Sequence, residues 1–222
     1  MTNLFKGELG QGLSFLGDLA AAGLSAEDVA WLRENARAAK EGGTQSILAD
    51  MVELVHHARS RASLLWERIS DTSIRVNLAA VPKPLFQCAT VEWNEGSGWV
   101  TVDRKGDDLY VNDRKVELFL MEGQKMGGVK GHGLRKQIDL SRALHPNILD
   151  ALLENVHLIP KSWKFDEHGW TRAIFFWGTI YRGSDGNLYV RCLYWSDVQW
   201  DWNYSWLDHI FGGLSPAAIS AS

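Results

Sequence analysis

The chain has 222 residues, and its 23 lysines and arginines stand against 27 acidic residues, which gives a formal net charge of -4. This balance excludes a strongly basic nucleic-acid coat and a strongly acidic tail. Hydrophobic residues make up 45% of the chain, so it can bury a sizeable core in one domain, or in a small domain beside a larger one. The 11 tryptophans are about three to four times the number that average composition predicts.

The N-terminal third has a helical period. Apolar residues predict one helix over residues 25–39 and a second over 44–69, and the two would pair as a helical hairpin. Pro82 cannot lie in a helix interior, so the period changes before it, and we place a boundary near residue 72. The sequence therefore predicts a helical region over 1–72 and an antiparallel β-rich domain over 73–222.

Alternating apolar residues predict short strands in the next segment. Residues 89–93 and 99–102 would form a hairpin around the glycines between them. Two more turns lead to strands at 109–111 and 116–121, which completes a small antiparallel meander. A helix is expected at about 146–155, where apolar residues recur at helical spacing.

The last third has the strongest pattern. Residues 174–182 and 188–195 predict a hairpin around a Gly-Ser-Asp-Gly turn. Strict alternation in the first strand would put Tyr181 on the same face as Phe175 and Trp177. The last segment, 211–222, resembles a fraying terminus.

These elements predict an α+β fold, in which an N-terminal helical hairpin precedes a mainly antiparallel β body with one inserted helix. Five segments of the β body form a further pattern: 109–120, 131–136, 157–164, 175–182 and 188–195. Together they resemble a group of hypothetical bacterial proteins known from genomes of uncultivated lineages. The resemblance covers residues 109–206 and implies no activity and no site residue, because none is assigned for that group.

The C-terminal aromatic residues are the first candidate site. On the predicted strand 199–207, three tryptophans and a tyrosine share one face. Such a face could bind sugars or bases by stacking, or it could be core, and core is the commoner use of aromatic residues in a small sheet. Because both faces of strand 174–182 are apolar, one needs a cover, such as the helix at 146–155, the N-terminal hairpin or a partner. The platform residues are Trp177, Tyr181, Trp195, Trp200, Trp202 and Trp206.

A basic, glycine-rich loop at 125–136 is the second candidate. Glycines let backbone N–H groups approach an anion, and Lys and Arg neutralise it, so a phosphate ligand or a nucleic acid is a plausible guest. The spacing matches no P-loop, and a solvated connection explains the same composition. The anion-binding residues would be Lys125, Lys130, His132, Arg135 and Lys136, with His132 as proton carrier if the protein is an enzyme.

Metal and nucleophile chemistry has no comparable signal. The histidines lack partners at ligand spacing, so no metal and no cofactor is expected. Cys88 and Cys192 are too few for a disulfide framework and fall on predicted strands among apolar neighbours, where a thiol is inert. No signal peptide and no membrane span is expected, and the cytoplasm is the expected location.

These observations predict a non-enzymatic intracellular binding protein that uses its aromatic C-terminal sheet to contact a protein partner or a second copy of itself. The alternative is a nucleic-acid or phosphate-ligand binding protein that uses the loop 125–136.

Overall fold

The structure, a computed structural model, describes residues 64–86, 89–196 and 198–221. The helices expected before residue 64 lie outside the described residues. Leu65–Gly96 and Val100–Ser222 form one compact unit.

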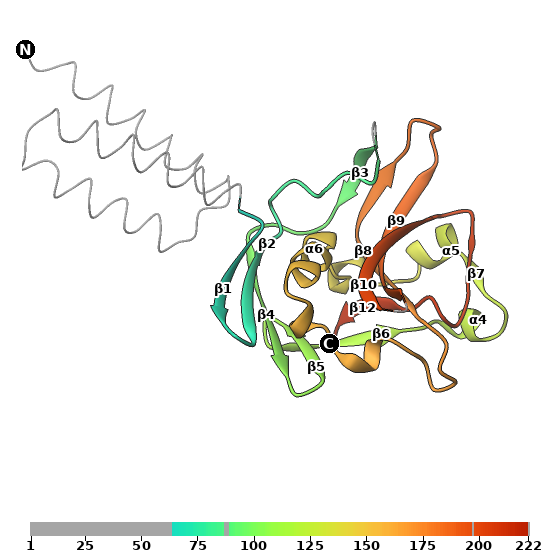
Figure 1. Ribbon diagram of the computed structural model, residues 1–222. Coiled ribbons are helices and arrows are strands. Elements are labelled where there is room, and N and C mark those ends of the chain that lie inside the picture. The colour runs from blue at the N-terminus through green and yellow to red at the C-terminus, as the bar shows by residue number, and fades with distance from the viewer. Residues whose placement is uncertain (1–63, 87–88, 197, 222) are drawn as a thin grey trace, which may run out of the picture. The chain divides into compact units, whose positions relative to one another are not determined.

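The unit is mainly β, with a mixed but mostly antiparallel sheet that curls into a half-barrel (Figure 1). Nine strands follow the order β1-β2-β4-β5-β6-β12-β8-β9-β10, and β3 pairs with β8. The strands of this sheet are β1 (Trp66–Ser70), β2 (Ser73–Asn77), β3 (Thr90–Asn94), β4 (Trp99–Lys105), β5 (Asp108–Val111), β6 (Arg114–Phe119), β8 (Ala173–Arg182), β9 (Leu188–Ser196), β10 (Gln199–Trp206) and β12 (Ala217–Ser220).

The remaining elements are short. A separate two-stranded sheet pairs β7 (Val129–Lys130) with β11 (Ile210–Phe211). The α-helices are α4 (Glu122–Lys125), α5 (Gly131–Arg135) and α6 (Pro146–Glu154), and the 3-10 helices are η2 (Leu140–Arg142), η3 (Val156–Leu158) and η4 (Lys161–Trp163).

The expected helix over 44–69 is wrong at its C-terminal end. β1 and β2 form an antiparallel hairpin with Trp66 opposite Val76, so the chain is already a strand at residue 66. Ile74 and Val76 alternate with polar residues and are both buried, and a strand with this pattern needs a paired neighbour. The run of apolar residues near Ile69 is so short that its spacing fits a helix and a strand equally well.

The meander of β4, β5 and β6 is confirmed by the antiparallel pairs that join them. The hairpin expected from 89–93 and 99–102 is wrong, although both segments are strands. β3 pairs instead with β8, with Val91 opposite Tyr181 and a register shift before Trp93. Strands that are adjacent in sequence need not be neighbours in a sheet. The glycine-containing segment between these two strands is a longer connection and not a tight turn.

The C-terminal segment does not fray. β12 lies inside the sheet, antiparallel to β6 and parallel to β8, and Ala217, Ala218 and Ile219 are buried. The backbone N–H of Phe175 also donates to the carbonyl of Pro216 at 2.8 Å. β12 therefore joins the β1–β6 half of the sheet to the β8–β10 half. Small side chains fit a strand that lies between two others. The same small residues are also typical of a disordered chain terminus, which is why the sequence suggested one.

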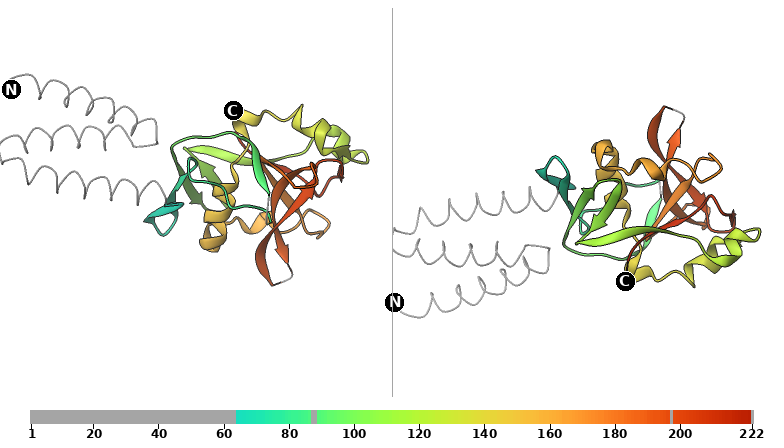
Figure 2. Two further views of the ribbon diagram at one scale, coloured as in Figure 1. Left: turned by 90° about the horizontal axis from the view of Figure 1, so that it is seen from above. Right: turned by 90° about the horizontal axis from the view of Figure 1, so that it is seen from below.

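The predicted helix at 146–155 is confirmed as α6, and it lies on the concave side of the half-barrel (Figure 1). Its residues Ile148, Leu149 and Leu152 are buried in one apolar core together with side chains of β2, β4, β5, β6, β8, β9 and β12. α6 is thus the cover that the apolar sheet face requires. The two views of Figure 2 show the paired strands β9 and β10 extending away from the rest of the unit.

A second core lies on the convex side of β8 and β9. Phe175, Trp177 and Cys192 pack there against Leu134 of α5 and Phe211 of β11. Both faces of β8 are therefore covered by the chain itself, one by α6, which was one of the three covers that the sequence suggested, and the other by α5 and β11.

The β8–β9 hairpin is confirmed, with Ile174 opposite Leu193 and Tyr181 opposite Tyr189. A register shift between Phe176 and Tyr181 changes the alternation of β8. Between the pairs Phe176–Arg191 and Tyr181–Tyr189, β8 advances by five residues and β9 by two. The expectation that Tyr181 shares a face with Phe175 is therefore wrong, because an odd difference moves the following side chains to the other face.

Candidate functional site

The aromatic face of β10 continues across β9. Residues directly opposite each other on antiparallel strands point to the same side of a sheet. The register pairs Trp200 with Trp195, Trp202 with Leu193, Tyr204 with Arg191 and Trp206 with Tyr189. This shared side is the concave one, because Leu193 belongs to the core around α6 and Trp200 and Trp202 pack against that core.

The six predicted platform residues do not share one surface. Trp177 and Tyr181 are buried, at 1% and 0% exposure, so they are core rather than contact residues. Burial raises the pKa of the Tyr181 hydroxyl to about 12. The other four are half-buried.

The rings of those four residues already have contacts within the chain. Lys164 Nζ lies 3.0 Å from the ring centroid of Trp195, which also packs edge-on against Trp200 at 5.5 Å. The guanidinium carbon of Arg191 lies 4.4 Å from the Trp202 ring centroid. Trp206 packs on His209 with centroids 5.5 Å apart. Cations and rings of the protein itself therefore occupy faces that a sugar or a base would need.

An aromatic cluster that the sequence analysis did not single out lies toward the β8–β9 turn. Phe86, Tyr189 and Tyr204 contact one another with all three centroid separations at 5.6 Å. Two of the contacts are edge-to-face, with interplanar angles of 87° and 85°, and the third is tilted. Tyr204 is 39% exposed, and the other two are half-buried. We call these three residues the aromatic triad.

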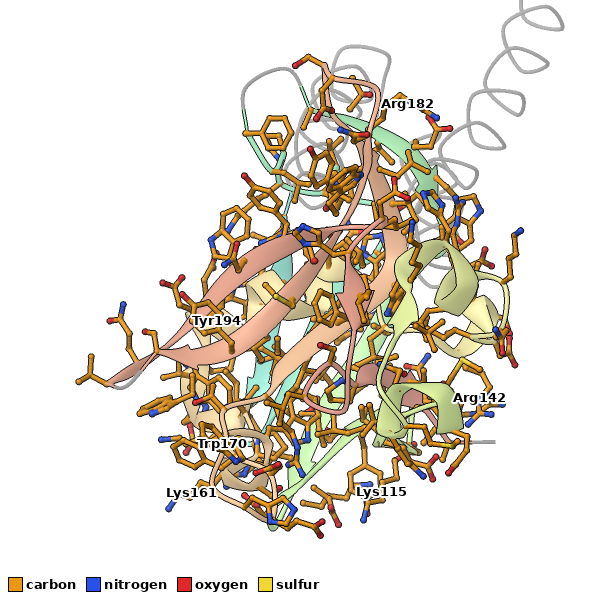
Figure 3. The ribbon with its side chains drawn as sticks, turned by 90° about the vertical axis from the view of Figure 1, so that its right-hand side faces the viewer. Lys115, Arg142, Lys161, Trp170, Arg182 and Tyr194 are labelled. Carbon is orange, nitrogen blue, oxygen red and sulfur yellow. The ribbon has the colours of Figure 1, made fainter. Side chains whose placement is uncertain are left out.

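The turn after β8 fixes the Tyr189 ring. The Tyr189 hydroxyl donates to Asp185 Oδ2 at 2.8 Å, and the Asn187 side chain donates to the same oxygen at 2.7 Å. These two hydrogen bonds hold the pKa of the Asp185 carboxyl below its usual value, and the bond from Tyr189 has the larger effect. Figure 3 shows Arg182 at this end of the molecule, well away from Trp170 and Tyr194.

Phe86 reaches the triad from the loop 78–86, which is fastened to α6. The side-chain nitrogen of Asn147 donates to the carbonyls of Asn77 and Ala80, both at 2.8 Å. Leu85, the neighbour of Phe86, is buried. The triad therefore joins three parts of the chain, each held by its own contacts.

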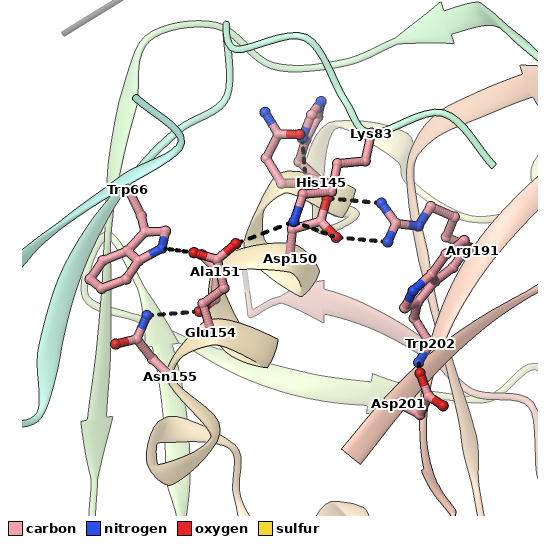
Figure 4. A network of polar contacts seen from close by, with 11 residues as sticks. Trp66, Lys83, His145, Asp150, Ala151, Glu154, Asn155, Arg191, Asp201 and Trp202 are labelled. Atoms are coloured by element: carbon pink, nitrogen blue, oxygen red, sulfur yellow. Dashed lines mark hydrogen bonds and ion pairs between the residues drawn. The ribbon is translucent and has the colours of Figure 1, made fainter. Parts of the chain in front are cut away.

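A charged network lies behind the aromatic face (Figure 4). Arg191 of β9 makes a bidentate ion pair with Asp150 of α6, at 2.9 and 2.7 Å, and both side chains are almost fully buried. Lys83 Nζ lies 4.0 Å from Asp150 and 3.2 Å from Glu154. The indole N–H of Trp66 donates to the other oxygen of Glu154. This network ties α6 to β9, to β1 and to the loop 78–86.

His145 begins α6 and is also buried. Its Nδ1 accepts the Asn147 backbone N–H at 3.0 Å, so Nε2 carries the proton, which it can donate to Asn94 Oδ1 at 2.6 Å. Burial, followed by the nearby Arg191 charge, lowers the pKa of His145 to about 4. A neutral ring with both nitrogens engaged is suited to capping the helix and holding β3, rather than to shuttling protons.

The basic loop is more ordered than the sequence predicted, because it forms α4, β7 and α5. A side chain at Gly128 would collide with the side chain of Ile210, and one at Gly131 would lie 2.8 Å from the Leu207 carbonyl oxygen. Close packing against the segment 207–211 thus accounts for these two glycines without an anion.

The predicted anion-binding side chains do not converge on one point. Lys125 pairs with Glu122 at 3.4 Å, while Lys130 and His132 lie 3.7 and 3.8 Å from Asp208. Arg135 packs over Trp93 at 5.7 Å from its ring centroid, and Lys136 is exposed. Nearby acids therefore offset much of the positive charge that the loop sequence suggests.

Cys192 is buried on β9, and burial raises the pKa of its thiol to about 12. Cys88 lies outside the described residues. Among residues 64–86, 89–196 and 198–221, no three histidines, cysteines or acids gather as a metal site. In that same part of the chain, no helix combines the length and the apolarity that crossing a membrane requires.

No family model matches the chain, and neither a curated protein nor a solved structure matches it. Membership of the group that residues 109–206 resemble therefore stays a prediction.

Asp150 and Arg191 were not predicted as partners, although both leave a signal in the sequence. Each is the one charged residue in a run of five, Asp150 in Ile-Leu-Asp-Ala-Leu and Arg191 in Tyr-Val-Arg-Cys-Leu. A buried charged side chain almost always has a partner of opposite charge, so two such residues are candidates for an ion pair with each other. No comparable signal points to Phe86, because the loop that carries it has no periodic pattern of apolar residues.

Proposed function

We propose that this protein is a non-enzymatic protein-interaction module whose contact surface is centred on the aromatic triad of Phe86, Tyr189 and Tyr204. The observation that carries the proposal is the exposure of Tyr204 within a cluster of rings that the fold holds in place. Tyrosine and tryptophan are enriched among the residues that dominate the energy of protein interfaces.

The rigidity of the triad supports this role. The Tyr189 hydroxyl is bound to Asp185, and the loop that carries Phe86 is fastened to α6 through Asn147. Side chains that are already ordered lose little conformational entropy when a partner binds, so more of the contact energy becomes affinity.

The ring geometry favours a protein over a sugar or a base. Stacking ligands need open, flat ring faces, whereas two contacts of the triad are edge-to-face, at 87° and 85°. Arg191 and Lys164 cover faces of Trp202 and Trp195. An irregular surface of ring edges suits the apolar side chains of another protein.

The nucleic-acid alternative has less support, since Glu122 and Asp208 pair with three of its proposed contact residues. A cytoplasmic location is part of the proposal and rests on the sequence alone.

Site-specific photo-crosslinking tests the proposal. A photoreactive phenylalanine derivative would replace Tyr204 in the full chain, in cells of the source organism, and crosslinked products would be identified by mass spectrometry. The matched control places the same residue at Trp170, an aromatic position that is 65% exposed and lies outside the triad. The proposal predicts a discrete protein adduct from position 204 only, and an adduct with the mass of two chains would identify a second copy as the partner. Equal yields at both positions, or no adduct at position 204, would contradict it.

A further inference from the structure

β10 has a free edge. It ends the order of nine strands, so in the described part of the chain it has a partner strand on one side only. Such an edge presents backbone N–H and C=O groups to which another chain can add a strand. The β10 sequence, Gln-Trp-Asp-Trp-Asn-Tyr-Ser-Trp, lacks the proline and lysine that protect many edge strands.

The hydrogen-bond phase of β10 shows which groups face this edge. The Leu207 N–H donates to the Leu188 carbonyl at 2.9 Å, one position beyond the Trp206–Tyr189 pair. Bonded and non-bonded pairs alternate along an antiparallel ladder. The even-numbered residues of β10 therefore direct their N–H groups away from β9, and they are Trp200, Trp202, Tyr204 and Trp206.

Two of these outward N–H groups are already occupied. The Trp202 N–H donates to Asp201 Oδ1 at 2.7 Å, and the Tyr204 N–H donates to Asn203 Oδ1 at 2.8 Å. In each case the acceptor is the side chain of the preceding residue, which belongs to the polar face of β10. The central donors of the free edge are thus satisfied within the chain.

We propose that Asp201 and Asn203 close the free edge of β10 against strand pairing with a second copy of this chain. Antiparallel pairing of β10 with its counterpart would follow two-fold symmetry, so each copy would have to release both side-chain bonds. The Asp201 carboxylate adds a charge at the same edge, which also opposes pairing. This role does not depend on the proposed function of the triad.

The test compares variants of the full chain by sedimentation velocity over a range of concentrations. The variant D201A/N203A removes both acceptors and is expected to self-associate at least about tenfold more tightly than the wild type, because donors on both copies become free to pair. The matched control D201N/N203D keeps an oxygen acceptor at both positions and the same net charge, so it should sediment as the wild type does. The variant D201N alone separates the two effects, since it removes the charge and keeps the acceptor.

Two results would overturn the proposal: unchanged self-association of D201A/N203A, or association of D201N as strong as that of D201A/N203A. Amide hydrogen exchange on dilute samples gives a second readout. The Trp202 and Tyr204 amides should exchange faster in D201A/N203A than in the wild type, while the amides of β8 keep their rates. Identical rates at Trp202 and Tyr204 in both proteins would overturn the assignment of the two acceptors.

Discussion

Replacing Asp150 by asparagine should strongly destabilise the β unit. The change leaves the shape of the side chain nearly intact but removes the charge that binds Arg191 at 2.9 and 2.7 Å. Arg191 is 1% exposed, so its guanidinium would stay buried without an anionic partner. Breaking a buried ion pair on one side costs about 3 to 5 kcal/mol, whereas replacing both partners by apolar residues is often nearly neutral.

Urea unfolding followed by tryptophan fluorescence measures this cost. A loss of about 3 to 5 kcal/mol corresponds to a midpoint about 1 to 2 M lower for a unit of this size. The double variant D150L/R191M should recover most of the loss. Lys83→Met is the matched control, because Lys83 lies 4.0 Å from the same carboxylate but is 56% exposed, and its loss should cost less than about 1 kcal/mol. If D150N lowered the free energy of unfolding by less than about 1 kcal/mol, the buried ion pair would be refuted, because a buried guanidinium without an anionic partner destabilises the fold by more than that.

Three further predictions follow from other parts of the unit. The folded pKa of His145 is about 4, below its ordinary value of 6.5, so the unfolded chain binds the proton more readily, and the free energy of unfolding should fall by up to about 3 kcal/mol between pH 6.5 and pH 4. H145Q should lack much of this fall in acid unfolding series, and an identical fall would contradict the assignment. Ala218→Asp puts a charge into the buried centre of β12 and should cost more than about 3 kcal/mol in thermal unfolding, whereas at a frayed terminus it would cost nothing. In a C88S background, Cys192 should react with a thiol reagent only after unfolding. Equal rates of thiol modification in buffer and in urea would show that Cys192 is not buried.

Local patterns predicted the elements whose partners are close in sequence. The β8–β9 hairpin, the meander of β4 to β6 and helix α6 each rest on a period or a turn within about 20 residues, a scale at which side-chain periodicity is informative. The small residues of β12 have no such pattern, and their pairing with β6 and β8 depends on chain segments far away. The same is true of β3, which crosses to β8 instead of pairing with β4.

The candidate site was only partly accessible from the sequence. The alternation of β10 placed Trp200, Trp202 and Trp206 on one face, and the register with β9 agrees with that placement. It could not reveal that α6 lies over this face, or that Phe86 comes from a distant loop to join Tyr204. Which aromatic residues remain exposed is decided by such tertiary covers, and no local pattern encodes them.

We propose that the aromatic triad binds a protein partner. The most direct measurement is the affinity of the full chain for the partner identified by crosslinking, compared between Tyr204→Ala and Trp170→Ala. A central interface tyrosine should weaken binding by about 30-fold when truncated, while Trp170→Ala should change it by less than about twofold. Equal effects of the two substitutions, or full affinity of Tyr204→Ala, would contradict a binding role for the triad.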